Sequence, residues 1–207
     1  MKKKISFVLI AFVIIMIPIY FLVKRTIAIE YQAESIDLFY AISDKVNPNK
    51  EKELEKIDIA IRLAPKNYLF YTTKAEMLVK LKEYQNAILE FRKIEKFEEN
   101  YAEGYVRQGT LFDLLKIPDS ALIQYNKALD SYNFRIEKYE DDPDKLMMAE
   151  INRLFVYIFL QDTTNAHIAF NSLKVEYPDN PTLKFLNDFD KERILNEIFK
   201  NWWKYAA

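Results

Sequence analysis

The sequence predicts an all-α fold, in which helix–turn–helix hairpins stack into a solenoid behind one amino-terminal transmembrane helix. Three observations support this prediction. A pattern of large, small and aromatic residues recurs after 34 residues, which is a period typical of stacked helical hairpins. Only two glycines occur among 207 residues, which disfavours a turn-rich β fold. Prolines divide the remainder of the chain into segments of helical length.

The composition excludes several classes of function. The chain contains no cysteine, so it can form neither a disulfide framework nor a cysteine-based zinc site. Its formal net charge is −1, whereas nucleic-acid-binding domains usually carry an excess of positive charge. No patterned carboxylates flank His167, and we find no activated serine or paired carboxylates for catalysis. We therefore expect no enzyme activity and no cofactor, metal or small-molecule substrate.

Residues 5–23 predict a transmembrane helix. They form nineteen consecutive uncharged residues after three lysines, and about 20 apolar residues are needed to cross a bilayer. The alternative is a cleaved secretory signal. However, the apolar stretch is longer than a signal requires, and the one weak cleavage site, Thr26-Ile27-Ala28, lies beyond Lys24 and Arg25. We therefore expect an uncleaved anchor.

The cations at the two ends of this segment predict its orientation. Residues 1–4 contain three lysines, whereas Lys24 and Arg25 follow the segment, so the bias modestly favours a cytoplasmic amino end. The bulk of the chain would then be extracytoplasmic. A composition rich in lysine, isoleucine, asparagine and tyrosine suggests a bacterial source, which places the expected location at the inner membrane, facing the periplasm.

The hydrophobic pattern of residues 68–101 recurs in residues 102–135. The first set is Tyr71, Ala75, Leu78, Ala87, Phe91 and Ile94, and the second set is Tyr105, Gly109, Phe112, Ala121, Tyr125 and Ala128. Short side chains are needed where helices cross at about 8–10 Å, so Gly109 and Ala121 should mark a close crossing. The aromatic residues should fill the core between hairpins rather than bind a ligand.

On these residues the chain resembles the tetratricopeptide repeat (TPR) family. The family pattern ends each repeat with a proline, which both copies lack. A third unit at about residues 147–180 matches in its second helix, through Ala166, Phe170, Leu173 and Pro178. Its first helix departs, with Leu154 where a small residue is expected. An insertion precedes this unit, so the second helix of the preceding repeat should run long, through Tyr132 and Ile136 to Tyr139.

A degenerate unit precedes the clear repeats. Ala60 and Pro65 hold family positions, whereas Glu53 occupies a position that should be small. Terminal units of a solenoid are expected to be atypical. The predicted organisation is a cytoplasmic end (1–4), a transmembrane helix (5–23), a juxtamembrane helix or linker (24–33), a solenoid (34–181, of which 34–65 is degenerate) and a carboxyl-terminal capping helix (182–207).

The resemblance implies that the first helix of each hairpin lines a concave binding groove. The candidate charged partner-binding positions in this groove are Glu76, Lys80, Arg107 and Asp113. Some TPR domains clamp the carboxylate terminus of chaperones with lysines and asparagines. Here Thr72 and Glu76 stand where that clamp needs a lysine and an asparagine, so chaperone-tail binding is disfavoured.

Residues 146–160 predict a helix with apolar residues on every face, and such a helix is normally buried all round. The face of this helix toward the groove consists of Met148, Ile151, Phe155 and Ile158. This face would be exposed to solvent unless another segment or a partner covers it. We expect residues 181–207 to form one helix, whose wide apolar stripe includes Phe199, Trp202 and Trp203. Three roles are open for it: a cap that covers this face, a partner-binding helix, or a membrane-interface anchor.

The sequence thus predicts a membrane-tethered scaffold or adaptor that mediates protein–protein interaction, such as an assembly subunit of a cell-envelope complex. The alternative is a regulatory subunit of an enzyme or secretion machine whose catalytic part lies in a partner. In both cases the expected partners are a protein and, through residues 5–23, the lipid bilayer. Nucleic acid is not expected.

Overall fold

The computed structural model describes residues 2–41, 50–98, 100–186 and 188–201. Within these ranges all regular secondary structure is helical, in agreement with the predicted fold class. Only the backbone is described for residues 2–13, 15, 37–41, 50, 185 and 199–201. The chain divides into two compact units, Met1–Leu81 and Lys82–Ala207.

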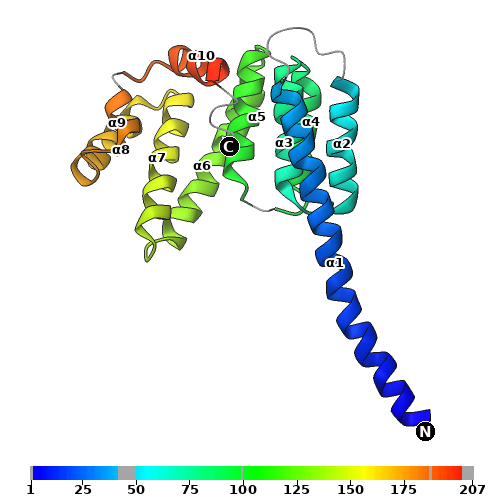
Figure 1. Cartoon of the computed structure of the whole chain (residues 1–207). Helices are drawn as coiled ribbons and strands as arrows, with labels where there is room; N and C mark the ends of the chain where they lie inside the picture. The colour runs from blue at the N-terminus through cyan, green and yellow to red at the C-terminus, as the bar shows by residue number, and fades with distance from the viewer. Residues whose placement is uncertain (1, 42–49, 99, 187, 202–207) are drawn as a thin grey trace. The chain divides into compact units, whose positions relative to one another are not determined.

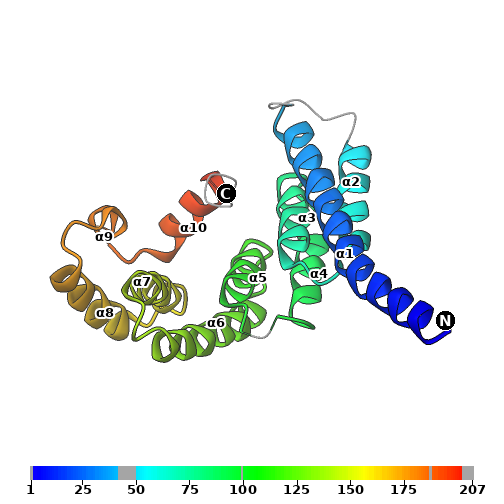
Figure 2. The same cartoon turned by 60° about the horizontal axis from the view of Figure 1, so that its bottom comes forward.

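The first unit is built from α1 (Lys2–Ala41), α2 (Lys50–Leu63) and α3 (Tyr68–Lys80). The predicted juxtamembrane segment and the first helix of the degenerate unit both belong to α1, with no break near residue 33. No glycine or proline interrupts residues 24–41, so nothing in the sequence ends the helix there. In both views α1 extends well beyond α2 and α3 (Figure 1, Figure 2).

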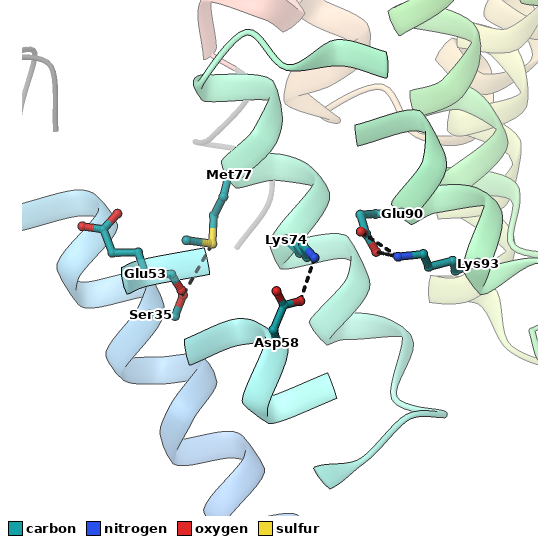
Figure 3. A network of polar contacts seen from close by, with 7 residues as sticks. All are labelled: Ser35, Glu53, Asp58, Lys74, Met77, Glu90 and Lys93. Carbon is teal, nitrogen blue, oxygen red and sulfur yellow. Dashed lines mark hydrogen bonds and ion pairs between the residues drawn. The ribbon is translucent and has the colours of Figure 1, made fainter. Parts of the chain in front are cut away.

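The carboxyl-terminal part of α1 packs against α2 and α3. The core of this packing consists of Ala28, Ile57, Ala60, Phe70 and Met77. The Ser35 hydroxyl donates to the backbone carbonyl of Glu53 at 2.9 Å. Lys74 pairs with Asp58 at 2.7 Å (Figure 3). Glu53 is fully buried. Ala60, at the expected small position, is also fully buried.

The amino-terminal part of α1 exposes large apolar side chains. Ile14, Phe21 and Leu22 are 63, 62 and 65 % exposed. In the part of the chain that the structure describes, no helix has both the length and the apolar composition to cross a membrane. Of the predicted transmembrane segment, the side chains of residues 5–13 and 15 lie outside the described ones.

The second unit contains the remaining described helices: α4 (Tyr84–Ile94), α5 (Ala102–Leu114), α6 (Pro118–Lys138), α7 (Pro143–Phe159), α8 (Thr163–Glu176), α9 (Pro181–Phe185) and α10 (Lys191–Asn201). Consecutive helices from α4 to α9 pack on one another. The prediction of a long α6 is confirmed, since this helix has 21 residues. The Asp142 side chain caps α7 ahead of Pro143, because it accepts the backbone N–H of Lys145.

The small positions of the repeats are buried in their respective units. They include Ala75, Ala87, Ala121, Ala128 and Ala166, none more than 1 % exposed. The aromatic residues Tyr71, Phe91 and Tyr125 are likewise at most 8 % exposed, as expected for core positions, and Tyr105 is half-buried. A Cβ atom on Gly109 would lie 2.5 Å from Cε1 of Tyr125, so the close crossing predicted at Gly109 is confirmed.

The turn inside each hairpin repeats in backbone geometry as well. Lys82 and Lys116 lie 34 residues apart and both have φ of 62°. Gln161, in the corresponding turn of the third unit, has φ of 58°. A residue in this left-handed conformation commonly ends a helix. The 34-residue period therefore applies to the backbone as well as to the side chains, and the third unit shares its turn.

The carboxyl-terminal segment forms two helices, which corrects the prediction of a single helix from Pro181 onward. Asn180 caps α9 by accepting the N–H groups of Thr182 and Leu183. Before α10, the Asp190 side chain accepts the backbone N–H of Arg193 at 2.7 Å. Aspartate side chains that bond to nearby backbone compete with helix formation, and this explains the break. Phe199 has no described side chain, and Trp202 and Trp203 lie outside the described residues.

Candidate partner-binding site

The predicted charged groove residues occur in both units. Glu76 and Lys80 belong to α3 in the first unit, and Arg107 and Asp113 belong to α5 in the second. Lys80 is exposed, whereas Glu76, Arg107 and Asp113 are half-buried. Of these four residues, Asp113 has the most extensive set of described contacts.

The apolar face predicted on α7 is partly covered. Ile151 and Ile158 are only 5 and 2 % exposed, and Phe155 is half-buried with its ring centroid 6.4 Å from that of Phe159. Met148 is 55 % exposed. Of the four residues predicted to form this face, only Met148 is therefore exposed.

Asp113 connects three helices. The Tyr125 hydroxyl on α6 donates to Oδ2 of Asp113 at 2.6 Å, and Nζ of Lys191, the first residue of α10, lies 2.9 Å from the same oxygen. The side chains of Lys191 and Asp113 are only 16 and 13 % exposed. The carboxylate on α5 therefore holds both a core tyrosine and the start of the carboxyl-terminal helix.

Asp113, Tyr125 and Lys191 form a cluster that is largely shielded from water, and this determines its electrostatics. Burial raises the pKa of the Tyr125 hydroxyl, and its hydrogen bond to Asp113 raises that pKa further, so the phenol stays protonated and remains a donor. The Lys191 ammonium also lies 5.2 Å from the centroid of the Tyr125 ring, within the range of a cation–π interaction. Removing either charge would leave the other one buried without its compensating partner.

The residues beside Lys191 extend this contact toward α7 and α8. The Phe189 ring lies 4.6 Å from His167 and 5.4 Å from Phe170 between ring centroids. A cavity of about 240 Å³ adjoins it, lined by Ile158, Gln161 and Thr163 on one side and by Phe189 to Glu192 on the other. In Figure 2, α5 to α9 follow a curve and α10 lies on its inner side.

Sequence reasoning did not identify Lys191 as part of this site, and treated Tyr125 only as a core residue. A lysine after an aspartate N-cap carries no local signal for a partner on α5, because that partner is distant in the chain. His167, which the sequence gave no metal-binding role, is exposed apart from its contact with Phe189. No group of three or more His, Cys, Asp or Glu among the described residues is placed to hold a metal ion.

Comparison with known proteins supports a TPR-like segment. Over 89 residues the chain is 33 % identical to the small glutamine-rich tetratricopeptide repeat-containing protein 2 of Saccharomyces cerevisiae. The matched segment covers 42 % of this chain and 26 % of the yeast protein, so the chain spans about a quarter of the length of that relative. No known protein-family profile matches the sequence.

Proposed function

We propose that this protein is an adaptor that binds other proteins through TPR-like hairpins and is tethered to a membrane by residues 5–23. The observation that carries the binding role is the repeat itself. Its side-chain pattern and its left-handed turns at Lys82 and Lys116 recur with the same period, and the similarity to a TPR-containing protein points the same way. Stacked hairpins of this kind present an extended surface suited to a protein partner.

The apolar surface of α1 supports the membrane tether. Ile14 and residues 16–23 include large apolar side chains that are 43 to 65 % exposed, and such a continuous apolar surface is uncommon in water. In the sequence this surface belongs to a segment of nineteen uncharged residues. With a cytoplasmic amino end, the hairpins would face the periplasm, where the adaptor would serve in the assembly of an envelope complex.

Alkaline carbonate extraction tests the tether. The full chain should stay in the membrane pellet, and mass spectrometry should find its amino terminus before residue 5. A mature protein that begins near Ile29 and is released by carbonate would refute the anchor, because residues 5–23 would then be a removed signal.

Site-specific photo-crosslinking in native membranes tests the binding role. A photo-reactive residue at Met148, which is 55 % exposed on the predicted groove face, should capture a protein partner. Val175 on α8 is 85 % exposed and provides the matched control, since we expect no partner there. The adaptor role would be refuted if neither position captured a protein, or if both captured the same abundant proteins.

A further inference from the structure

We propose that the inner face of α5–α8 is a groove for a partner's amphipathic helix that carries a cation in its first turn. We further propose that α10 occupies this groove within the same chain until such a partner displaces it. This inference rests on the proposed adaptor function and names both the surface and the class of partner. The partner is identified by the chemistry of α10, which occupies the groove in the structure.

The first argument is the way α10 is seated. Its first residue, Lys191, reaches Asp113 on α5, and Ile194 and Leu195 are buried at 4 and 5 % exposure. Residues at positions i, i+3 and i+4 share one face of a helix. A single face of α10 therefore presents one cation and two apolar anchors, which is the pattern of a helix bound in a groove.

The second argument is the charge selectivity of the groove. The Asp113 carboxylate is 13 % exposed, and of its described contacts only Lys191 supplies a positive charge, while the Tyr125 hydroxyl supplies a neutral hydrogen bond. A carboxylate in such a position is costly unless a cation compensates it. The groove should therefore accept a helix with lysine or arginine at this place and reject one with an acidic residue.

The third argument is that α10 can be replaced. The described residues between α9 and α10, Leu186 and 188–190, are not helical, so α10 can leave without unfolding α9. A cavity of about 240 Å³ remains between the start of α10 and the ends of α7 and α8. This cavity is partly open to solvent, so a side chain that fills it would remove apolar surface from water. A partner helix with larger side chains beside its cation could fill this space and so bind better than α10 does.

The short connection also explains why a partner would have to compete. A tethered segment has an effective concentration in about the millimolar range. A free helix of identical sequence should therefore bind the wild-type chain weakly, because α10 already fills the groove. Weakening α10 at a position that leaves the groove unchanged should uncover the binding site.

The test uses the full chain in detergent and a fluorescent peptide of residues 186–201. Lys191→Glu places two acidic groups together, so it should release α10 while Asp113 is retained. The peptide should then bind at least about tenfold more tightly than it binds the wild type, as expected when roughly 1.4 kcal/mol or more of competition is removed. Lys184→Glu on α9 is the matched control, because Lys184 pairs only with the 97 % exposed Asp179 in the described contacts.

The charge reversal tests the proposed chemistry. Asp113→Lys should also release α10, but this variant should bind only a peptide that carries glutamate in place of lysine at position 191. The double variant with both changes restores an ion pair, and should again bind either peptide weakly. Tight binding of the matched peptide by each single variant would show that the variant is folded, and circular dichroism provides an independent check for the double variant.

Three results would overturn the inference. These are equal binding of the peptide to wild type and Lys191→Glu, no binding to any variant, or a wild-type dimer in which α10 is exchanged between copies. If the peptide does not bind but Met148 still captures a protein, only this inference fails. If the peptide binds as expected and Met148 captures nothing, the groove chemistry stands and the adaptor role fails.

Discussion

Gly109→Ala is the substitution that most directly tests the helix crossing at the centre of the second unit. The added Cβ atom would lie 2.5, 2.7 and 2.9 Å from Cε1, Cδ1 and Cζ of Tyr125, whereas carbon atoms normally approach to about 3.5–4.0 Å. The Tyr125 ring has little room to yield. It is 1 % exposed, its hydroxyl is bound to Asp113, and it stacks on Phe159 with centroids 5.2 Å apart.

Two opposing contributions determine the magnitude. Overpacking a core by a methyl group or more costs about 1–3 kcal/mol. Alanine is favoured over glycine inside a helix by about 1 kcal/mol. The net change for Gly109→Ala should therefore be a loss of about 0–2 kcal/mol in the free energy of unfolding. Gly109→Leu brings more atoms into the same space with no better helix propensity, so its loss should be larger, at least about 2 kcal/mol.

The decisive assay is a double-mutant cycle with Tyr125→Leu, which removes the ring that the new methyl group would meet. In that background Gly109→Ala should become stabilising by about 1 kcal/mol, because only the helix-propensity gain is left. Hydrogen exchange of the α5 and α6 amides measures the effect locally, which suits a chain of two units. A Gly109→Ala change that is equally destabilising in both backgrounds, or stabilising in the wild type, would refute this account of the crossing.

Three further predictions concern a turn, a cap and a titrating side chain. Lys116→Gly should stabilise the second unit by up to about 1 kcal/mol, since its φ of 62° suits glycine; no gain in melting temperature would argue against strain there. Asn180→Ala should destabilise α9 by about 1 kcal/mol through loss of its N-cap, and unchanged exchange of the Thr182 amide would contradict this. Burial, and then the charge of Glu176, raise the pKa of the Glu150 carboxyl. An acid with a raised pKa contributes stability below its ordinary pKa, and that contribution is lost as pH rises through the folded-state pKa. Glu150→Gln should therefore raise the melting temperature at neutral pH and have little effect near pH 4. A larger gain in melting temperature at pH 4 than at neutral pH would show that the pKa of Glu150 is not raised in the folded protein.

The parts of the fold that could be predicted are those with local causes. Proline at the first position of α7 and aspartate before it determine where that helix begins, and both are visible in four consecutive residues. The glycine at position 109 predicts a close contact between helices, because the repeat pattern assigns this position to a helix crossing. The left-handed turns recur with the same period, but the sequence did not predict them, because lysine rather than glycine occupies positions 82 and 116.

The parts that could not be predicted depend on contacts between distant segments or on competition between two local signals. From Pro181 onward the apolar periodicity favoured one long helix, whereas Asp188 and Asp190 favoured a new start, and the capping bonds prevailed. The pairing of Asp113 with Lys191 has no local signal at all. It results from the position of α10 beside α5, which is a property of the folded unit.

The buried ion pair at Asp113 should determine which helix binds the groove more than how tightly it binds. A buried pair contributes little net stability, because desolvation of the two charges offsets most of their attraction, although loss of one partner is costly. A competing helix with its own first-turn cation would meet the same desolvation cost and make the same pair, so the charge contribution would nearly cancel between α10 and the competitor. Displacement would then depend on two quantities: the effective concentration of tethered α10 and the free energy that a competitor gains by burying apolar surface in the cavity beside Lys191. A helix without the cation would leave Asp113 without its ion pair, however well the apolar side chains of that helix packed. One lysine–aspartate pair can therefore make the groove selective for a cationic helix, while α10 itself remains exchangeable.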